Sequence, residues 1–296
     1  MNAGEIIIDH ALALDWARLP AGAQQAARTF LHDTICVGVA GRNAANTDRV
    51  FAAAQLWVGA DGSPVLGRPG ARLAAPYAAF VNAFQIHAQE FDCVHEAAVA
   101  HPMATVVAAL MAETARSGPH DGANFLSALV AGVDVVATLG VAVTSPLKFF
   151  RPATAGIFGS VAALARLRRM DRAMALNAFG CALAFASGTM QAHVEGKPTL
   201  ALQVAAAARS LRANRRAPHR SAVGLPGIVR IPRRGNPLPE GWETLPRRPH
   251  GLGRGRNPLS MAPEPMSPRQ RGVAHECGAT MVGGRCRAFA GASRAR

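Results

Sequence analysis

The densest group of reactive side chains in this sequence lies between residues 82 and 102. Three histidines and three carboxylates occur there, between long apolar segments: His87, Glu90, Asp92, His95, Glu96 and His101. General acid–base catalysis uses such groups, because a neighbouring carboxylate adjusts the basicity of an imidazole. The stretch therefore predicts either proton transfer to a substrate or a set of helix caps and buried hydrogen-bond partners with no catalytic role.

A zinc site is a second chemistry to consider for this stretch. In the zinc-binding pattern H-E-x-x-H, the two histidines lie four residues apart on one face of a helix. Here His95 and His101 are six residues apart, and Pro102 follows directly. We therefore predict a site without metal or cofactor. We interpret His87 and His95 as supporting or core histidines, and Cys93 as a small buried residue rather than a nucleophile.

Helices must position this stretch, because apolar residues recur at helical spacing on both sides of it. Proline, glycine and a possible cap at Asp121 mark the helix ends, and the segment 91–101 is predicted to be irregular. A short extended piece is predicted at residues 63–66. The fold class is predicted to be mainly α, with one helical domain over residues 1–208. The predicted helices span residues 6–19, 23–39, 47–58, 73–88, 102–116, a segment from 121, 153–168, 171–186 and 199–208.

Two segments, 125–147 and 173–191, are apolar enough to resemble membrane spans. Asp134 interrupts the first, and much of the second consists of Ala, Gly, Ser, Thr and Asn. We interpret both as buried core helices and predict no membrane association. The five cysteines are scattered without a CxxC pair, and carboxylates interrupt the apolar N-terminus. Both observations predict a cytoplasmic protein without a disulfide framework.

The composition changes near residue 208. Residues 1–208 hold 14 Lys and Arg against 14 Asp and Glu, whereas residues 209–296 hold 18 Arg, no Lys and four Glu. The second part is also rich in Pro and Gly and has no apolar periodicity, so we predict a disordered basic tail. One hypothesis is a truncated or frameshifted gene product. The alternative is a functional Arg-rich tail that binds nucleic acid, which is disfavoured because only Trp242 and Phe289 could stack on bases.

Several segments in residues 5–208 resemble the MmgE/PrpD family in the family's order. Two places carry most of this resemblance. The first is the block at residues 90–102, which begins with acidic-Phe-Asp and ends with His-Pro, and the second is Pro-Ala-Thr-Ala-Gly at residues 152–156. The matching segments are FLHDTICVGVAG at 30–41, VNAFQIHAQEFDCVHEAAVAHPMATVVAALMA at 81–112, LVAGVDVVATLG at 129–140, FFRPATAGIFGSVAALARL at 149–167 and ALAFASGTMQAHVEGK at 182–197.

The resemblance implies a lyase similar to 2-methylcitrate dehydratase of propionate metabolism, which eliminates water from a small di- or tricarboxylate or decarboxylates it. It places Glu90 or Asp92 and His101 in the site as acid–base groups. Arg151 stands where relatives carry a second histidine, and an arginine there could clamp a substrate carboxylate. Lys148 and Lys197 are the further candidate substrate-binding cations, or else ordinary solvated lysines.

The resemblance also implies a helical domain with a smaller α/β lid, and a homodimer. The sequence after residue 208 shows no such lid, and a lid excludes water and orients the substrate in enzymes that close over it. We therefore expect weak or no lyase activity from this chain, and an exposed helical surface that promotes association.

Overall fold

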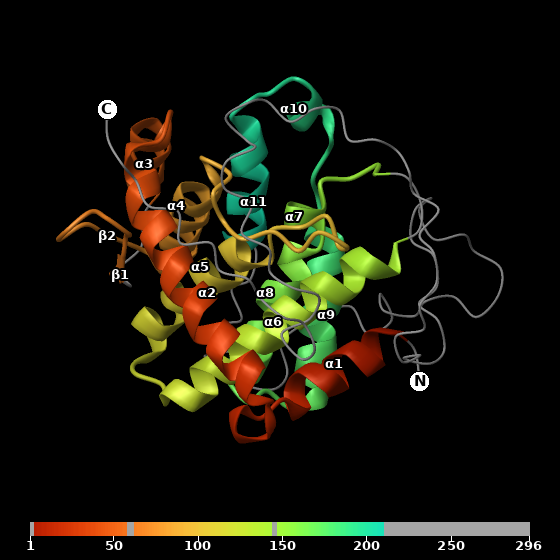
Figure 1. The fold of residues 1–296 in the computed structure, drawn as a ribbon. Helices are drawn as coiled ribbons and strands as arrows, with labels where there is room; N and C mark the ends of the chain where they lie inside the picture. The colour runs from red at the N-terminus through yellow and green to blue at the C-terminus, as the bar shows by residue number, and fades with distance from the viewer. Residues whose placement is uncertain (1–2, 58–61, 144–146, 210–296) are drawn as a thin grey trace.

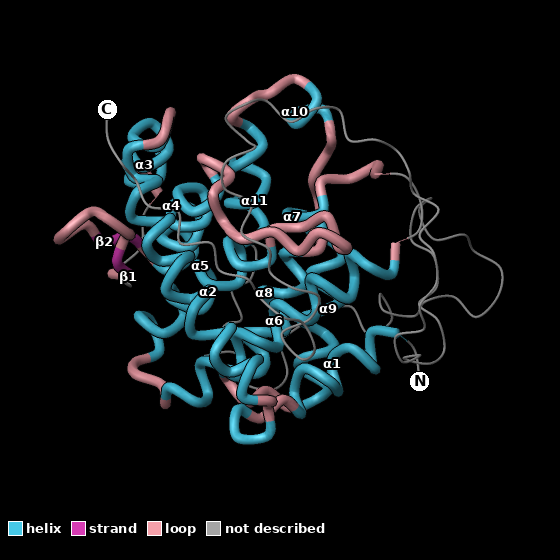
Figure 2. Tube along the Cα trace, viewed as in Figure 1, coloured by secondary structure: helices cyan, strands magenta, loops and turns pink. Residues whose placement is uncertain are grey.

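The computed structural model describes residues 3–57, 62–143 and 147–209, and these residues fold mainly as α-helices (Figures 1 and 2). Two short 3₁₀ helices follow α1 and α2, at Trp16–Arg18 and Gly41–Asn43. The helices are α1 Ala3–Ala13, α2 Ala21–Ala40, α3 Thr47–Gln55, α4 Ala75–His87, α5 Pro102–Ser117, α6 Gly122–Ala142, α7 Arg151–Thr154, α8 Gly156–Leu167, α9 Arg172–Phe185, α10 Gln191–Val194 and α11 Thr199–Arg209.

One small hairpin accompanies the helices in the described part of the chain. β1 (Ser63–Pro64) pairs antiparallel with β2 (Arg72–Leu73), and Ser63 lies opposite Leu73. The hairpin lies at the edge of the molecule, whereas long loop segments gather near α7, α10 and α11 (Figure 2). Those loops, rather than the hairpin, carry most of the reactive residues that the sequence singled out.

The centre of the domain is the contact between α6 and α8. A Cβ at Gly132 would lie 2.8 Å from the Gly159 carbonyl oxygen, and a Cβ at Gly159 would lie 2.7 Å from the Gly132 carbonyl oxygen. Glycine at both positions therefore lets the two helix backbones approach closely. Ala, Val and Leu side chains of α4, α5, α6 and α8 fill the space around this contact. Small residues pack helices tightly in this way because they leave no bulk between the backbones.

Among the described residues, α6 is the one helix long and apolar enough to span a membrane, and most of it is buried inside the protein. Asp134 lies in its middle, with one carboxylate oxygen 3.3 Å from Nε2 of His10 on α1. A core helix has these properties, in agreement with the interpretation of segment 125–147. The other apolar segment forms α9, which is shorter.

A buried ion cluster joins α5 to the end of α8. The Glu113 side chain is 5% exposed and accepts hydrogen bonds from Arg116, at 2.9–3.1 Å, and from Nε of Arg168, at 2.7 Å. Burial by itself raises the pKa of Glu113, but the hydrogen bonds and charges of the two arginines outweigh it and lower the pKa overall. The sequence does not reveal this cluster, because no local motif links Glu113 to a residue 55 positions away.

The predicted fold class is confirmed, and most predicted helices appear within a few residues of their expected ends. Asp121 caps α6 as expected, since its side chain accepts a hydrogen bond from the Asn124 N–H at 3.0 Å. The expected helix 6–19 is wrong at its end: α1 stops at Ala13 and a separate 3₁₀ turn follows, capped by Asp15. The predicted disordered tail lies outside the described residues, apart from Arg209 at the end of α11.

Candidate active site

The chain between α4 and α5 turns back sharply directly after His87. Glu90 has a left-handed backbone with φ of 53°, which is uncommon for a residue with a side chain. The Glu90 N–H donates to the His87 carbonyl oxygen at 3.0 Å and closes the turn. The turn returns the chain so that Asp92 lies against His87.

The residues between Asp92 and His101 form a closed loop. The N–H of His95 donates to the Ala100 carbonyl at 2.8 Å, so the two ends of the loop are held side by side. Inside the loop, the Ala98 N–H donates to Nδ1 of His95 at 3.1 Å. His101 then precedes the first residue of α5. The loop therefore brings Asp92 and His101 together, although they are nine residues apart.

Asp92 is hydrogen-bonded to two histidines. Its carboxylate, which is fully buried, lies 3.1 Å from Nδ1 of His87 and 3.2 Å from Nδ1 of His101. Nδ1 of His101 also lies 3.1 Å from the backbone carbonyl of Asp92. The two imidazole rings are nearly perpendicular, with centroids 4.8 Å apart. The side chain of His101 is 18% exposed, so His101 is the member of this His–Asp–His group that reaches the surface.

The electrostatics of the group favour a charged Asp92 and a protonated His101. Burial by itself raises the pKa of Asp92, but His101 and His87 outweigh it and hold the pKa well below its usual range. Burial likewise lowers the pKa of His101, while the charges of Asp92 and Glu90 outweigh it and raise the pKa overall. Because Nδ1 of His101 is bound to Asp92, Nε2 is the ring atom left for exchanging a proton with a substrate.

His87 has a different environment from His101. It is almost completely buried, its ring centroid lies 5.8 Å from that of Phe150, and its Nε2 has no hydrogen-bond partner among the described residues. The interpretation of His87 as a supporting histidine agrees with this position. The sequence analysis did not foresee that His87 shares the carboxylate of Asp92. Its position as the last residue of the helix before the turn is the signal that could have indicated it.

His87, Asp92 and His101 also offer one possible metal-ligand atom each, and these atoms lie within 4.8 Å of one another. In the described geometry both Nδ1 atoms already face the Asp92 carboxylate, so a divalent cation would have to replace two hydrogen bonds. The H-E-x-x-H arrangement does not form, because His95 lies on the loop rather than on a helix.

Arg151 contacts backbone carbonyl groups. Its Nη1 donates to the carbonyls of Ala98, at 3.0 Å, and Gly140, at 3.1 Å, and its Nη2 lies 3.5 Å from that of Val143. The sequence predicted a clamp for a substrate carboxylate at this position, and that role stays a prediction. The guanidinium connects the loop between Asp92 and His101 to the end of α6. Burial lowers the pKa of Arg151, which still stays protonated at neutral pH.

The two lysines are exposed and lie on neighbouring loop segments. Lys148 directly precedes Phe149, which pairs with Thr189 through an isolated β-bridge. Lys197 lies just before α11, and its N–H donates to the Ala192 carbonyl at 2.9 Å. Their role in substrate binding stays a prediction, as do the catalytic roles of Glu90, Asp92 and His101.

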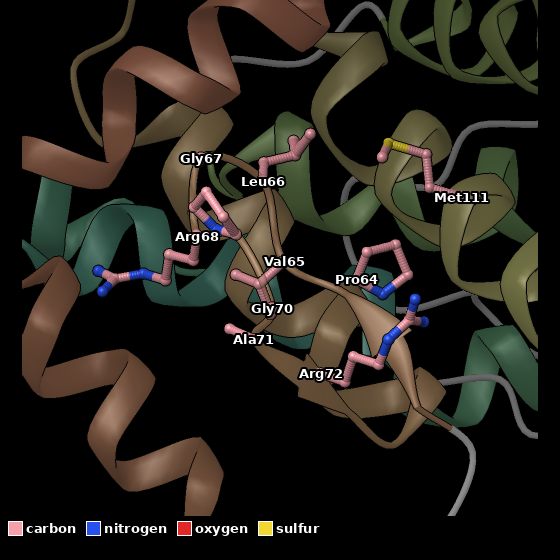
Figure 3. A pocket seen from close by; sticks show the side chains of 10 residues that line it. Pro64, Val65, Leu66, Gly67, Arg68, Gly70, Ala71, Arg72 and Met111 are labelled. Atoms are coloured by element: carbon pink, nitrogen blue, oxygen red, sulfur yellow. The ribbon is translucent and has the colours of Figure 1, made fainter.

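A pocket of about 310 Å³ lies elsewhere, beside the β1–β2 hairpin. Pro64, Arg72 and Met111 lie together on one side of it, whereas the Arg68 guanidinium points away from them (Figure 3). Arg68 is already bound to Asp48 at 2.6 Å. None of the residues predicted to act on a substrate lines this pocket.

Comparison with known proteins agrees with the resemblance seen in the sequence. The sequence-family model of the MmgE/PrpD N-terminal domain matches residues 5–220. Human cis-aconitate decarboxylase is 30% identical over 186 residues, which cover 59% of this chain and 38% of the relative. The mouse cis-aconitate decarboxylase is 28% identical over 179 residues, covering 58% of this chain and 36% of the relative. The chain thus spans less than two fifths of the length of these relatives. It belongs to the MmgE/PrpD family through its N-terminal domain.

Proposed function

We propose that this chain is a lyase-family protein whose site acts on a small di- or tricarboxylate by acid–base catalysis, with the weak turnover that the sequence predicts, and that His101 exchanges the proton. The observation that carries the proposal is the hydrogen bond between Nδ1 of His101 and the buried carboxylate of Asp92. An aspartate in this position fixes the imidazole orientation and stabilises the imidazolium ion. The similarity to two cis-aconitate decarboxylases supports a lyase of this kind.

The environments of the two candidate carboxylates suggest different roles. Asp92 is fully buried and bonded to two histidines, so it would act through His101 rather than on the substrate. Glu90 is half-buried and close enough for its charge to raise the pKa of His101. Glu90 is therefore the carboxylate that we propose as the second acid–base group.

The proposed reaction needs a proton donor and a proton acceptor. In dehydration, a base removes a proton from the carbon beside a carboxylate, and an acid protonates the leaving hydroxyl group. In decarboxylation, the loss of carbon dioxide leaves an electron pair as a carbanion, which can be delocalised over a neighbouring double bond, and an acid protonates that carbanion. A histidine with a raised pKa is well suited to the acid role, because a larger fraction of it is protonated at neutral pH than of an unperturbed histidine. Lys148 and Lys197 are the cations proposed to attract the substrate carboxylates.

The test compares the full chain with His101→Asn and with His32→Asn as the matched control. His32 is exposed on α2, where its described side-chain contact is Cys36 at 3.8 Å. Cis-aconitate and 2-methylcitrate are the substrates, with decarboxylation and dehydration followed by product analysis. We expect the His101 variant to lose about 10²–10⁴-fold in kcat/KM, and the His32 variant to match the unchanged chain.

Binding is measured separately, by NMR of ¹⁵N-histidine-labelled protein during titration with each acid. We expect the ring signals of His101 to shift and those of His32 to stay in place. Absence of both turnover and any shift at His101, for both acids, would contradict the proposal. Turnover that survives His101→Asn would contradict the assigned role of His101.

A further inference from the structure

Arg151 connects three parts of the chain that are distant in sequence. It is the first residue of α7, and its guanidinium donates to Ala98, in the loop between Asp92 and His101, and to Gly140, in the last turn of α6. The third carbonyl, that of Val143, follows the end of α6. Carbonyl groups at the C-terminal end of a helix lack partners in the helix, so the half-buried arginine there supplies donors to groups that have no partner within the helix.

The backbone contact beneath Arg151 is very close. A Cβ at Gly140 would lie 2.6 Å from both the Cβ and the carbonyl oxygen of Ala98. The loop therefore rests directly on the backbone of α6, and Arg151 joins the two carbonyls across this contact. Ala98 is also the residue whose N–H donates to His95 inside the loop. Arg151 thus holds the middle of the loop, whose two ends are Asp92 and His101.

We propose that Arg151 is a positioning residue, which fixes the loop against α6 and thereby holds His101 on the Asp92 carboxylate. The inference rests on the proposed function for its catalytic consequence, but the geometry it describes does not depend on turnover. It differs from the carboxylate clamp expected from the sequence, because the hydrogen bonds described for Arg151 go to the protein's own carbonyls.

The two roles predict different effects of Arg151→Gln on His101. Loss of the positive charge by itself would raise the pKa of His101 or leave it unchanged. Loosening the loop would weaken the contact with Asp92, and the pKa would fall towards the ordinary value of 6.5. The charged and titratable groups that face His101 are Asp92, Glu90 and His87, and all three remain in the variant.

Arg166→Gln is the matched control. Arg166 is also a half-buried arginine that donates to a carbonyl, that of Leu14 at 2.6 Å, and to the side chain of Asn124 at 2.7 Å. Its loss should destabilise the fold without touching the loop. We expect the NMR titration of His101 to shift to lower pH in Arg151→Gln and to stay unchanged in Arg166→Gln.

Two further variants keep the test decisive if Arg151→Gln does not fold. Arg151→Lys keeps the charge with fewer directed donors, so we expect a smaller downward shift of the His101 pKa. Gly140→Ala removes no charge but pushes the loop away from α6, so we expect a downward shift as well. An unchanged or raised His101 pKa in the folded variants would overturn the proposal. An unchanged or raised His101 pKa combined with weaker binding of cis-aconitate would favour the role of Arg151 as a clamp for a substrate carboxylate.

Discussion

Among the described residues, two buried carboxylates each bind two basic side chains, and the two groups differ in the kind of base. Glu113 is bound by Arg116 and Arg168, whereas Asp92 is bound by His87 and His101. Arginine stays protonated throughout the range in which proteins fold, so the Glu113 cluster is a fixed ion pair. Histidine gains and loses its proton near neutral pH, so the Asp92 group can change its charge while its position stays the same.

The two groups therefore differ through the basic side chains that bind the carboxylate, and not through its burial. Arginine partners give a fixed ion pair, whereas histidine partners can gain or lose a proton. Both carboxylates have a lowered pKa for the same reason, since the attraction of their cationic partners exceeds the penalty of burial. Only the Asp92 group has a partner, His101, whose pKa is raised from the neutral range and whose side chain reaches the surface.

The largest effect on the free energy of unfolding is expected from Glu113→Gln. This change leaves two arginines in a buried site without their carboxylate, and Arg168 is only 7% exposed. Breaking a buried ion pair from one side typically costs about 3–5 kcal/mol in the free energy of unfolding. Urea unfolding measures it, and the His101 titration should stay unchanged. A loss below about 1 kcal/mol would show that the cluster resembles a surface ion pair.

A smaller and pH-dependent effect is expected from Asp92→Asn, because the histidines can lose their protons and arginines cannot. Removing a buried hydrogen-bonded charge at pH 6 should cost about 1.5–3 kcal/mol in the free energy of unfolding. The pKa of His101 is raised in the folded state above its ordinary value of 6.5. The contribution of the contact between His101 and Asp92 to stability is therefore fully present below pH 6.5 and is lost as the pH rises through the folded-state pKa.

The pH profile tests this sign directly. His10, beside Asp134, has a raised pKa, and His95 has a lowered pKa. The unfolding free energy of the whole protein therefore depends on pH through several histidines at once. The difference in unfolding free energy between the unchanged chain and Asp92→Asn cancels these other histidines. We expect that difference to decrease from pH 6 towards alkaline pH. A difference that is constant or increases over this range would contradict the assignment of His101 as the titrating partner.

A third and smaller effect on stability tests the contribution of His87, the other histidine bound to Asp92. His87→Leu removes one hydrogen-bond donor from buried Asp92 and should cost about 1–3 kcal/mol in unfolding free energy. His87→Asn is the matched variant, because the asparagine amide can occupy the place of Nδ1 and donate to the same carboxylate. We expect His87→Asn to retain most of the stability that His87→Leu loses. Equal losses in both variants would indicate that packing against Phe150 matters more than the hydrogen bond.

The smallest effect on stability is expected from Lys148→Met and Lys197→Met. Both lysines are exposed, and surface substitutions usually change the unfolding free energy by less than about 0.5 kcal/mol. If these cations attract substrate carboxylates as proposed, cis-aconitate should bind more weakly, and increasingly so at low ionic strength where charge attraction is strongest. Unchanged binding in the double variant would remove both lysines from the proposed site.

The sequence by itself determined the helical fold and the region of the site. Apolar spacing, Pro102 at the start of α5 and Asp121 before α6 are local signals, and helices form from local hydrogen bonds between residues near in sequence. The same locality explains why Asp92 and His101 could be recognised: both lie on one short loop. The expected first helix ends early, at Ala13, and the segment after it makes a tertiary contact that the sequence did not indicate, since the N–H of Trp16 donates to the Ser127 hydroxyl of α6.

The tertiary structure alone decided which groups are partners. Nothing in the local sequence indicates that Arg151 binds the carbonyls of Ala98 and Gly140, or that Glu113 meets Arg168. Such pairs depend on where separate helices cross, and the small residues of α6 and α8 set that crossing by letting their backbones approach. Sequence patterns could therefore indicate the types of reactive groups, whereas the packing of the helices decided which of the groups that are distant in sequence are in contact.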